Sequence, residues 1–335
     1  MKLLRRLLVA LVVVAALWSA LWFGAATWIE SRFDAQVAQL AQRGTTVACA
    51  GRGVSGYPFA LRLDCPRARV EGRGASIALA DLSAGMSLAA PNTFRARPVG
   101  PAQIDLANGD AVELGWRAMD GAVDDLFSDD RTLAAAFGDL VAKGPFGSLS
   151  VASGRFEARP FPASGPVRND LRISVAQSAV TLEPEWSADL PDLDLPRLRA
   201  DVVLAGAYEA LVRRGERASD YVRSGFSGRI ERLSVALPND GLLLIAGPFG
   251  VDAAGRQSGE ITVAVRNAPA VADFARSLGG EEAGLVIEAL AGLGEERVID
   301  GERVQALDVR VADGKIPVGF FSFDLPPLWR TTPGS

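Results

Sequence analysis

Histidine is absent from the 335 residues of this chain, and only two cysteines are present. Without an imidazole base, nucleophile systems of the Ser-His-Asp and Cys-His kinds are excluded. The usual zinc, copper and iron sites are excluded too, because they need histidine or more than two thiolates. Carboxylate chemistry remains open, but the sequence contains no recognisable catalytic constellation. We therefore expect a protein that is not an enzyme, with no catalytic residue, bound metal or cofactor.

Basic residues are also fewer than acidic ones: the chain has 35 basic and 40 acidic residues, and its net charge is -5. Three of the basic residues, Lys2, Arg5 and Arg6, stand before the first apolar run, so the remainder is more acidic still. Binding to nucleic acid or to anionic lipid headgroups depends on basic groups that attract phosphate. Nucleic acid is therefore not an expected partner.

Residues 7–29 form a run of 23 residues without a charge. As a helix the run would be roughly 34 Å long, enough to cross a hydrocarbon core of roughly 30 Å. Basic residues precede the run and Glu30, Arg32 and Asp34 follow it, which favours an N-terminus in the cytoplasm. We expect a membrane anchor in the bacterial inner membrane and a C-terminal domain in the periplasm. The alternative is a signal peptide cleaved near Gly24-Ala25-Ala26, which would leave the domain in the same compartment.

The expected organisation has four parts. Residues 1–30 form the basic start and the anchor, and 31–44 form an amphipathic linker helix that ends at Gly44. Residues 45–325 form a strand-rich periplasmic domain, with a subdivision left open near the Pro-rich, acidic segment 183–198. Residues 326–335 form a tail.

Cys49 and Cys65 are predicted to form a disulfide, because an exported chain with an even number of cysteines usually pairs them. The segments 45–50 and 59–64 both have the composition of strands, so the bond would join two neighbouring strands across a turn. Closing a loop of this length stabilises a fold by about 3 kcal/mol. Two separate buried thiols are the alternative.

The turn between the cysteines contains Gly51, Gly53 and Gly56, which match G-x-G-x-x-G. That motif binds a pyrophosphate only where a helix begins directly after it. Here Pro58 and a strand-like segment follow, so the glycines indicate a turn with positive φ angles and not a dinucleotide site.

Short alternating segments dominate the remainder and predict antiparallel strands with one buried face. The predicted fold class is α+β, mainly antiparallel β: one N-terminal transmembrane helix, then a large curved-sheet domain with a few packing helices. Hairpins are expected within 147–158, within 171–182, and at the Asp313-Gly314 turn. Helices are expected over the residues 128–143, 206–222, 267–278 and 281–293.

Two groups of acidic residues allow carboxylate chemistry to be considered. Asp124, Asp125, Asp129 and Asp130 lack the spacing of a calcium loop, so a helix cap and solvated charge explain them better. Glycan hydrolysis needs two carboxyl groups that face one cleft. The acidic residues that would have to supply this pair are Glu183, Glu185, Asp189, Asp192 and Asp194.

The chain resembles a bacterial family known as domain of unknown function 2125. The resemblance is carried by the basic start and single anchor, by Gly53-Val-Ser-Gly56-Tyr57-Pro58-Phe59, and by Val311-Ala-Asp313-Gly314-Lys-Ile316-Pro-Val318-Gly319 near the end. It implies an exported, membrane-anchored protein without an assigned activity, and it transfers no catalytic residue.

Two functions follow as expectations. The first is a non-enzymatic envelope protein whose curved sheet binds a lipid, another apolar ligand or a partner's strand, as envelope bridge proteins with an open β-groove do in outline. The second is a periplasmic glycan hydrolase that uses two carboxylates. For the first function, two alternatives remain open. The apolar faces of the strands bind the ligand, or they cover a closed and fully packed core.

Overall fold

The structure is a computed structural model, and it describes residues 2–42, 44–72, 74–106, 109–145, 147–161, 169–184, 193–318, 321–325 and 327–328. The contacts divide the chain into two compact units. We call Met1–Leu126 with Ala142–Pro145 the N-terminal unit, and Phe127–Val141 with Phe146–Ser335 the C-terminal unit. The segment 183–198 lies inside the C-terminal unit.

The N-terminal unit begins with one helix, α1 (Lys2–Gln42), which joins the expected anchor and linker into a single rod. Within Arg5–Gln42, a stretch of 18 residues with a mean hydropathy of 2.4 makes it long and apolar enough to cross a membrane. Gly44 follows at a φ of 80°, a conformation that glycine adopts without strain. A membrane anchor and a signal sequence both meet this description.

Seven strands make up the sheet of the N-terminal unit. Their hydrogen-bonded order is β1-β3-β4-β5-β6, with β2 beside β3 and β7 beside β5. The pairs β1–β3, β2–β3, β3–β4, β4–β5, β5–β6 and β5–β7 are antiparallel. The strands are β1 (Thr45–Cys49), β2 (Gly53–Ser55), β3 (Ala60–Gly72), β4 (Ala75–Ser87), β5 (Ala90–Leu106), β6 (Ala111–Gly115) and β7 (Ala118–Asp124).

The C-terminal unit continues with longer antiparallel strands in the order β9-β10-β11-β12-β13-β14-β16-β15, and the unit boundary falls within β8. A separate pair, β17 (Lys315–Val318) and β18 (Phe321–Asp324), follows. The strands are β8 (Thr132–Gly144), β9 (Gly147–Phe161), β10 (Asp170–Pro184), β11 (Leu193–Leu204), β12 (Phe226–Ala236), β13 (Leu242–Val251), β14 (Gln257–Arg266), β15 (Glu295–Ile299) and β16 (Glu302–Val311).

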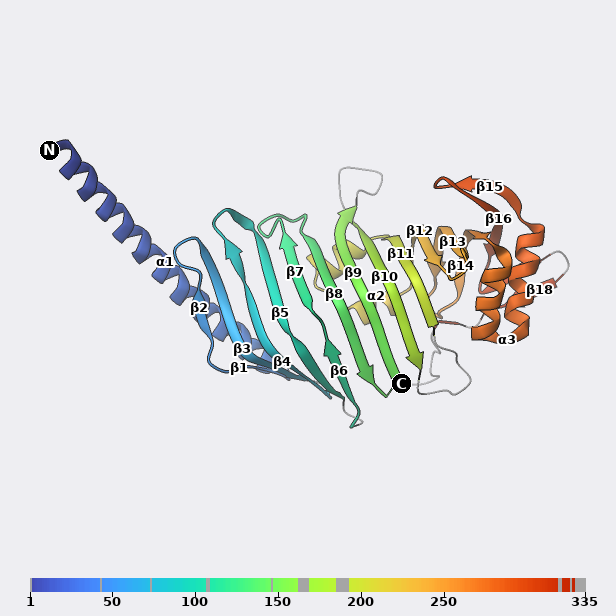
Figure 1. Cartoon of the computed structure of the whole chain (residues 1–335), viewed down its shortest axis with the longest axis horizontal. Coiled ribbons are helices and arrows are strands. Elements are labelled where there is room, and N and C mark those ends of the chain that lie inside the picture. Colours follow the sequence, from blue (N-terminus) through green and yellow to red (C-terminus); the bar gives the residue numbers. More distant parts are fainter. Residues whose placement is uncertain are drawn as a thin grey trace. The chain divides into compact units, whose positions relative to one another are not determined.

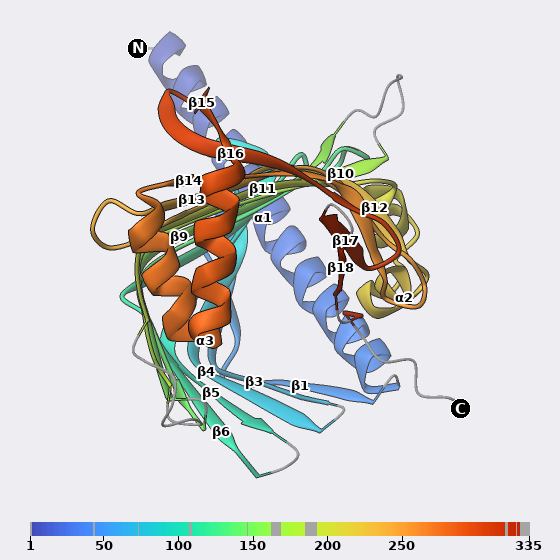
Figure 2. The same ribbon diagram turned by 90° about the vertical axis from the view of Figure 1, so that its right-hand side faces the viewer.

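Three helical segments pack on this part of the sheet. They are η1 (Tyr208–Arg213), a π-helical turn, α2 (Ala218–Arg223) and α3 (Ala268–Leu293). Figure 2 shows α3 and α2 on the same side of the sheet, towards opposite ends of its strands. The predicted class, mainly antiparallel β with a few helices after one N-terminal helix, is therefore confirmed.

The helix predicted over 128–143 is wrong, because this segment forms most of β8. Within β8, Asp139 has a φ of 49°, and a residue at positive φ inside a strand is typical of a bulge that shifts the alternation by one. Leu133, Phe137 and Leu140 therefore have a helix-like spacing while they lie in a strand. Hydrogen bonding to neighbouring strands outweighs the few tenths of a kcal/mol per residue that helix propensity supplies.

The hairpins predicted within 147–158 and 171–182 are also wrong, because each segment lies in one continuous strand. In β10 the small polar residues read as a turn mark a local irregularity, since Ala179 has a φ of 46° and is skipped in the pairing while the register stays the same on both sides. The helix predicted over 206–222 is broken at Gly215, whose φ is 66°. The helices at 267–278 and 281–293 are confirmed as the two halves of α3, which bends at Gly280.

The tight turn at Asp313-Gly314 is confirmed, with both residues at positive φ and the Ala312 and Lys315 backbones hydrogen-bonded to each other. β17 then pairs with β18 and does not extend the hairpin with β16. After Gly51, Gly53 and Gly56 comes strand β3, preceded by a turn with a cis Tyr57-Pro58 bond. The helix that a dinucleotide site would need is therefore not there.

Candidate functional site: an apolar row on each sheet

One row of side chains crosses the C-terminal unit from β9 to β16 without a polar member. Successive residues on a strand point to opposite faces, so directly paired residues share a face. The pairing of neighbouring strands links seven apolar residues in this way. We call them the C-terminal row: Phe156, Val175, Ala200, Leu233, Ile245, Val263 and Leu307.

The helices cover the sheet on either side of this row but not the row itself. Towards one end of the strands, Tyr208 of η1 packs in a cluster with Ala158 and Leu171. Towards the other end, Val271 of α3 packs with Leu237 and Val265. Val271 is only 1% exposed, whereas Phe156 is 37% exposed and the other six members of the row are half-buried. The row is thus an apolar strip between two packed cores.

The opposite face of β9 to β12 is polar, whereas that of β13, β14 and β16 carries a buried apolar cluster that includes Leu244, Ala264 and Ala306. One residue along from the row, Glu157, Ser174, Asp201 and Arg232 are paired across β9 to β12. Burial raises the pKa of Asp201, but hydrogen bonds from Ser174 and Arg199 outweigh it and leave the pKa below its ordinary value. The carboxylate therefore stays charged and hydrogen-bonded, as expected on a face that contacts water.

A depression of about 580 Å³ lies on this polar face. Its charged lining consists of four arginines and three acids, so the charges largely offset each other. The structure thus offers no strongly basic site here for an anion. The charged residues are Arg155, Glu157, Arg159, Arg172, Arg199, Asp201 and Glu231.

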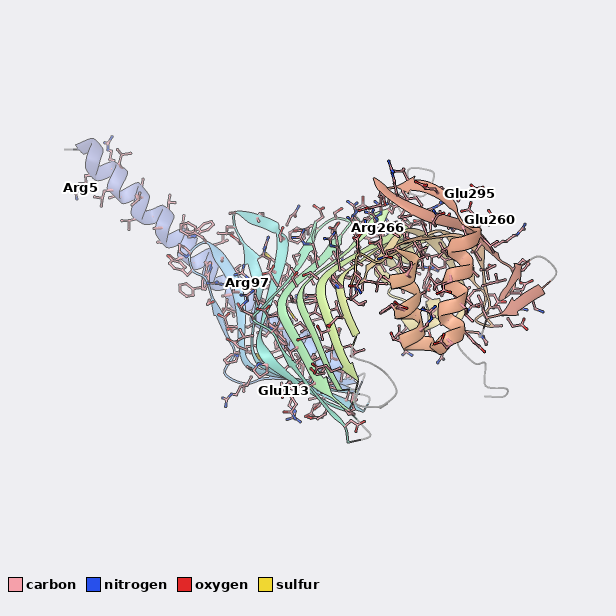
Figure 3. The ribbon with its side chains drawn as sticks, turned by 45° about the vertical axis from the view of Figure 1, so that its right-hand side comes forward. Arg5, Arg97, Glu113, Glu260, Arg266 and Glu295 are labelled. Carbon is pink, nitrogen blue, oxygen red and sulfur yellow. A yellow bond between two sulfur atoms is a disulfide. The ribbon has the colours of Figure 1, made fainter. Side chains whose placement is uncertain are left out.

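The N-terminal unit repeats the arrangement on a smaller scale. Pairing from β1 to β6 links five apolar residues on one face, which we call the N-terminal row: Val47, Val70, Ile77, Ile104 and Val112. They are half-buried or exposed. The next residues along belong to the other face and include Glu71, Ser76 and Asp105, with the Ser76 hydroxyl donating to Asp105 at 3.0 Å. Glu113, labelled in Figure 3, belongs to the same polar face.

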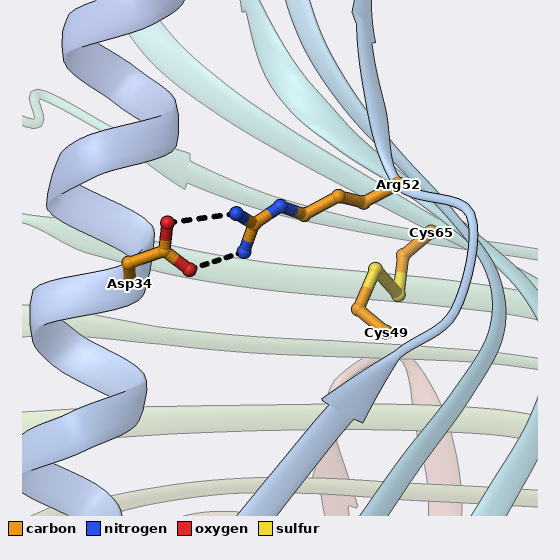
Figure 4. Close-up of a disulfide and its surroundings, with 4 residues drawn as sticks. All are labelled: Asp34, Cys49, Arg52 and Cys65. Atoms are coloured by element: carbon orange, nitrogen blue, oxygen red, sulfur yellow. Dashed lines mark hydrogen bonds and ion pairs between the residues drawn. A yellow bond between two sulfur atoms is a disulfide. The ribbon is translucent and has the colours of Figure 1, made fainter.

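Cys49 and Cys65 form the predicted disulfide, with their Cα atoms 5.3 Å apart. It joins β1 to β3, two strands that pair directly. In the turn that follows β1, Arg52 binds Asp34 of α1 through both of its terminal nitrogens, one bond being 2.7 Å long (Figure 4). The hydrogen bond from Arg52 is the main cause that lowers the pKa of Asp34. The disulfide thus joins β1 to β3, and the ion pair joins the turn after β1 to α1.

The acidic residues considered for glycan hydrolysis are not brought together by the residues that the structure describes. Glu185, Asp189 and Asp192 lie outside them. Glu183 is exposed at the end of β10, and the carboxylate of Asp194 accepts a hydrogen bond from the Thr181 hydroxyl at 2.8 Å. Such a bond between neighbouring strands is structural.

The aspartates at 124–130 do not cap a helix, so that part of the interpretation is wrong. Asp124 instead accepts a hydrogen bond from Thr93 at 2.7 Å, and Asp130 lies 3.5 Å from Arg213. Within the described ranges, no three acidic or cysteine residues converge where they could hold a metal ion.

Comparison with known proteins decides the family. A family described as uncharacterised protein conserved in bacteria (DUF2125) matches residues 22–323, which is most of the chain. The chain belongs to the DUF2125 family. The match begins at Trp22 on α1 and ends in β18, so it includes both rows. Neither a curated protein nor a solved structure matches the chain.

Sequence reasoning had not identified the two rows as sites. The alternation that creates them is visible in the sequence, and it predicted strands with one apolar face. Which residues of that face lie under a helix depends on where η1, α2 and α3 pack. That information comes from contacts between segments far apart in sequence.

Proposed function

We propose that this DUF2125 protein is a non-enzymatic envelope protein, anchored in the bacterial inner membrane, that binds the hydrocarbon chains of a lipid along its apolar rows in the periplasm. The observation that carries the proposal is the C-terminal row, seven consecutive apolar residues that are left half-buried between two packed cores. Soluble proteins rarely leave a contiguous apolar surface uncovered unless it binds something.

The dimensions of the row suit a lipid chain. Seven strands at a spacing of about 4.8 Å give a row about 29 Å long. One leaflet of a bilayer has a hydrocarbon thickness of about 15 Å, half of the full core. An acyl chain laid across the strands would therefore contact three or four of the seven side chains.

The energy of such contact is also adequate. Full burial of a Val, Leu or Ile side chain gains about 1.5–3 kcal/mol, so a half-buried one has roughly 1 kcal/mol left to gain. The full row would supply several kcal/mol before the costs of association. That sum fits reversible binding better than permanent retention.

The anchor places this surface next to a source of lipid. α1 has basic residues before its apolar run and none within it, which favours an orientation with the domain on the periplasmic side. The run of 23 uncharged residues is longer than the apolar region of an ordinary signal peptide, which supports retention in the membrane. The acidic chain supports a ligand recognised by its hydrocarbon and not by a phosphate group.

A pair of neighbouring substitutions tests the proposal. Leu233 belongs to the C-terminal row, and Ser234, the next residue on β12, points to the opposite face, where it pairs with Arg199 of β11 and Leu244 of β13. Full-length wild type, Leu233→Gln and Ser234→Gln would be purified in the same detergent, and the phospholipid retained per protein measured by mass spectrometry. We expect Leu233→Gln to retain less lipid than wild type and Ser234→Gln to retain the same amount. Equal retention by all three proteins would refute binding at the row, since lipid held by the anchor is common to them.

A further inference from the structure

A second apolar surface of the N-terminal unit lies beside the anchor. The turn at Tyr57–Pro58–Phe59 packs against the middle of α1, where the Tyr57 ring stacks on Phe23 with centroids 6.0 Å apart and meets Trp22 edge-on. Trp22 is only 7% exposed. The contact lies within the uncharged run 7–29, so the turn is held against residues that are expected to lie in the bilayer.

The geometry of the anchor decides at what depth this contact lies. About 20 helical residues are needed to cross the hydrocarbon core, so a span that starts at Leu7 extends to about Ala26. If the span ended below Trp18, only 11 residues would remain, roughly 17 Å of helix. The docked turn therefore belongs at the level of the outer leaflet and not above it.

The side chains at this place are those of a lipid-exposed surface. Phe59 is 71% exposed, Tyr57 51% and Leu88, at the end of the β4–β5 hairpin, 43%. Leu88 lies next to the turn, because its N–H donates to the Phe59 carbonyl at 2.9 Å. The segments 53–61 and 82–94 contain no charged residue.

The backbone of the turn is also prepared for a medium without water, in which every carbonyl needs a partner inside the protein. The Trp18 indole N–H donates to the Pro58 carbonyl at 3.1 Å, and that of Trp22 donates to the Ala60 carbonyl at 2.9 Å. The Gly56 carbonyl accepts from Phe59 and Ala60. The hydroxyls of Ser19 and Tyr57 bind each other at 2.8 Å. The tryptophan side chains of α1 thus donate hydrogen bonds to backbone carbonyls of the turn that would otherwise have no partner in hydrocarbon.

From these contacts we propose that the Tyr57–Phe59 turn and the Leu88 tip are inserted into the outer leaflet of the membrane that holds α1. The partner is a lipid bilayer, and the turn before β3 and the tip between β4 and β5 lie inside it. The inference rests on the retained anchor of the proposed function. It adds that the N-terminal unit contacts the hydrocarbon directly, so that no linker separates the unit from the membrane.

Three single-cysteine variants of the full chain test the insertion, since the native cysteines are joined in the disulfide. Leu11→Cys reports on the anchor, Phe59→Cys on the turn, and Glu113→Cys on the polar face of the same unit. Each would be labelled with a polarity-sensitive fluorophore and placed in phosphatidylethanolamine–phosphatidylglycerol vesicles with or without lipid that carries a quencher on its acyl chain. Unchanged thermal unfolding would confirm that the variants fold.

We expect the labels at positions 11 and 59 to lose fluorescence to a similar extent in the quencher vesicles, with a blue-shifted emission at both, and the label at 113 to keep its fluorescence. Quenching at 11 without quenching at 59 would overturn the insertion and leave the anchor standing. Absence of quenching at 11 would instead refute the anchor, and the insertion with it.

Discussion

At the scale of single residues, Tyr208 joins two segments far apart in sequence. Its side chain is buried, and its hydroxyl donates to the Asp129 carbonyl at 2.8 Å, with the Arg131 carbonyl 3.2 Å away. Burial is the main cause that raises its pKa. We expect Tyr208→Phe to lower the free energy of unfolding by about 1 kcal/mol, because the carbonyls of Asp129 and Arg131 lose a hydrogen-bond donor. Denaturant titration measures this, with the exposed Ser219→Ala as control. A loss no larger than that of the control would contradict the role.

The ion pair between Asp34 and Arg52 predicts a dependence on pH. The pKa of Asp34 is below the ordinary 3.8, chiefly through the hydrogen bond from Arg52. Because a depressed folded pKa stabilises the folded state above the unfolded pKa, the contribution is complete above about pH 4 and is lost as the pH falls through the folded pKa. Arg52→Gln should raise the Asp34 pKa towards 3.8, as measured by carboxyl NMR. Arg69→Gln, which removes the partner of Glu71, should leave it unchanged; an equal shift in both would be contrary to this account.

The disulfide gives a third prediction at this scale. It closes a loop with a sequence separation of 16 residues, which corresponds to about 3 kcal/mol of stability. Denatured protein isolated from the periplasm should show no free thiol without reductant and two with it, and the double variant Cys49→Ser, Cys65→Ser should unfold at lower denaturant. Two free thiols without reductant would remove the bond from the account.

At the scale of elements, the bend of α3 depends on one glycine. Gly280 has a φ of 76°, while Gly292 lies in the same helix without a positive φ, and a Cβ would meet no atom at either position. Gly280→Ala should destabilise the unit by about 1 kcal/mol, because an L-residue strains at positive φ. Gly292→Ala should stabilise it by a few tenths to about 1 kcal/mol. Thermal unfolding tests this: we expect the midpoint temperature to fall for Gly280→Ala and to rise for Gly292→Ala, relative to wild type. Shifts of the same sign would show that the positive φ at Gly280 is not the cause.

The elements also show how far sequence alone extends. The apolar N-terminal helix, the strand character of the sheet, both halves of α3 and the Asp313-Gly314 turn were predictable, because their signals are local. The strand β8 was not, because its bulge at Asp139 produces a helix-like spacing. The continuous strand β10 was not, because the small polar residues around Ala179, which has a positive φ, resemble a turn. In both cases the outcome depends on pairing with strands that local patterns do not specify.

At the scale of the whole molecule, the proposal depends on the compartment of everything after α1. A reporter that is active only outside the cytoplasm, fused after Gln42, should be active, and one that is active only inside should not, because the basic residues precede the apolar run. A matched fusion with Lys2, Arg5 and Arg6 changed to Glu should weaken or reverse this result. Cytoplasmic activity of the unchanged chain would remove the envelope role and the basis for the disulfide.

Candidate sites at this scale were only partly accessible to sequence reasoning. The disulfide could be predicted, since it needs only two cysteines and an exported chain. The C-terminal row could not, because Val175 and Leu307 become part of one surface only when the strands between them are in register. The proposal therefore rests on the pairing of β9 to β16 more than on any motif.

Site-specific photo-crosslinking in living cells tests lipid binding at this row most directly. A photoreactive benzoyl-phenylalanine would replace Val175, in the row, or Ala176, the next residue on β10, which points to the polar face. After illumination, we expect mass spectrometry to find lipid attached at position 175 and none at position 176. Lipid at neither position, or equally at both, would contradict the claim that the apolar row is the binding surface.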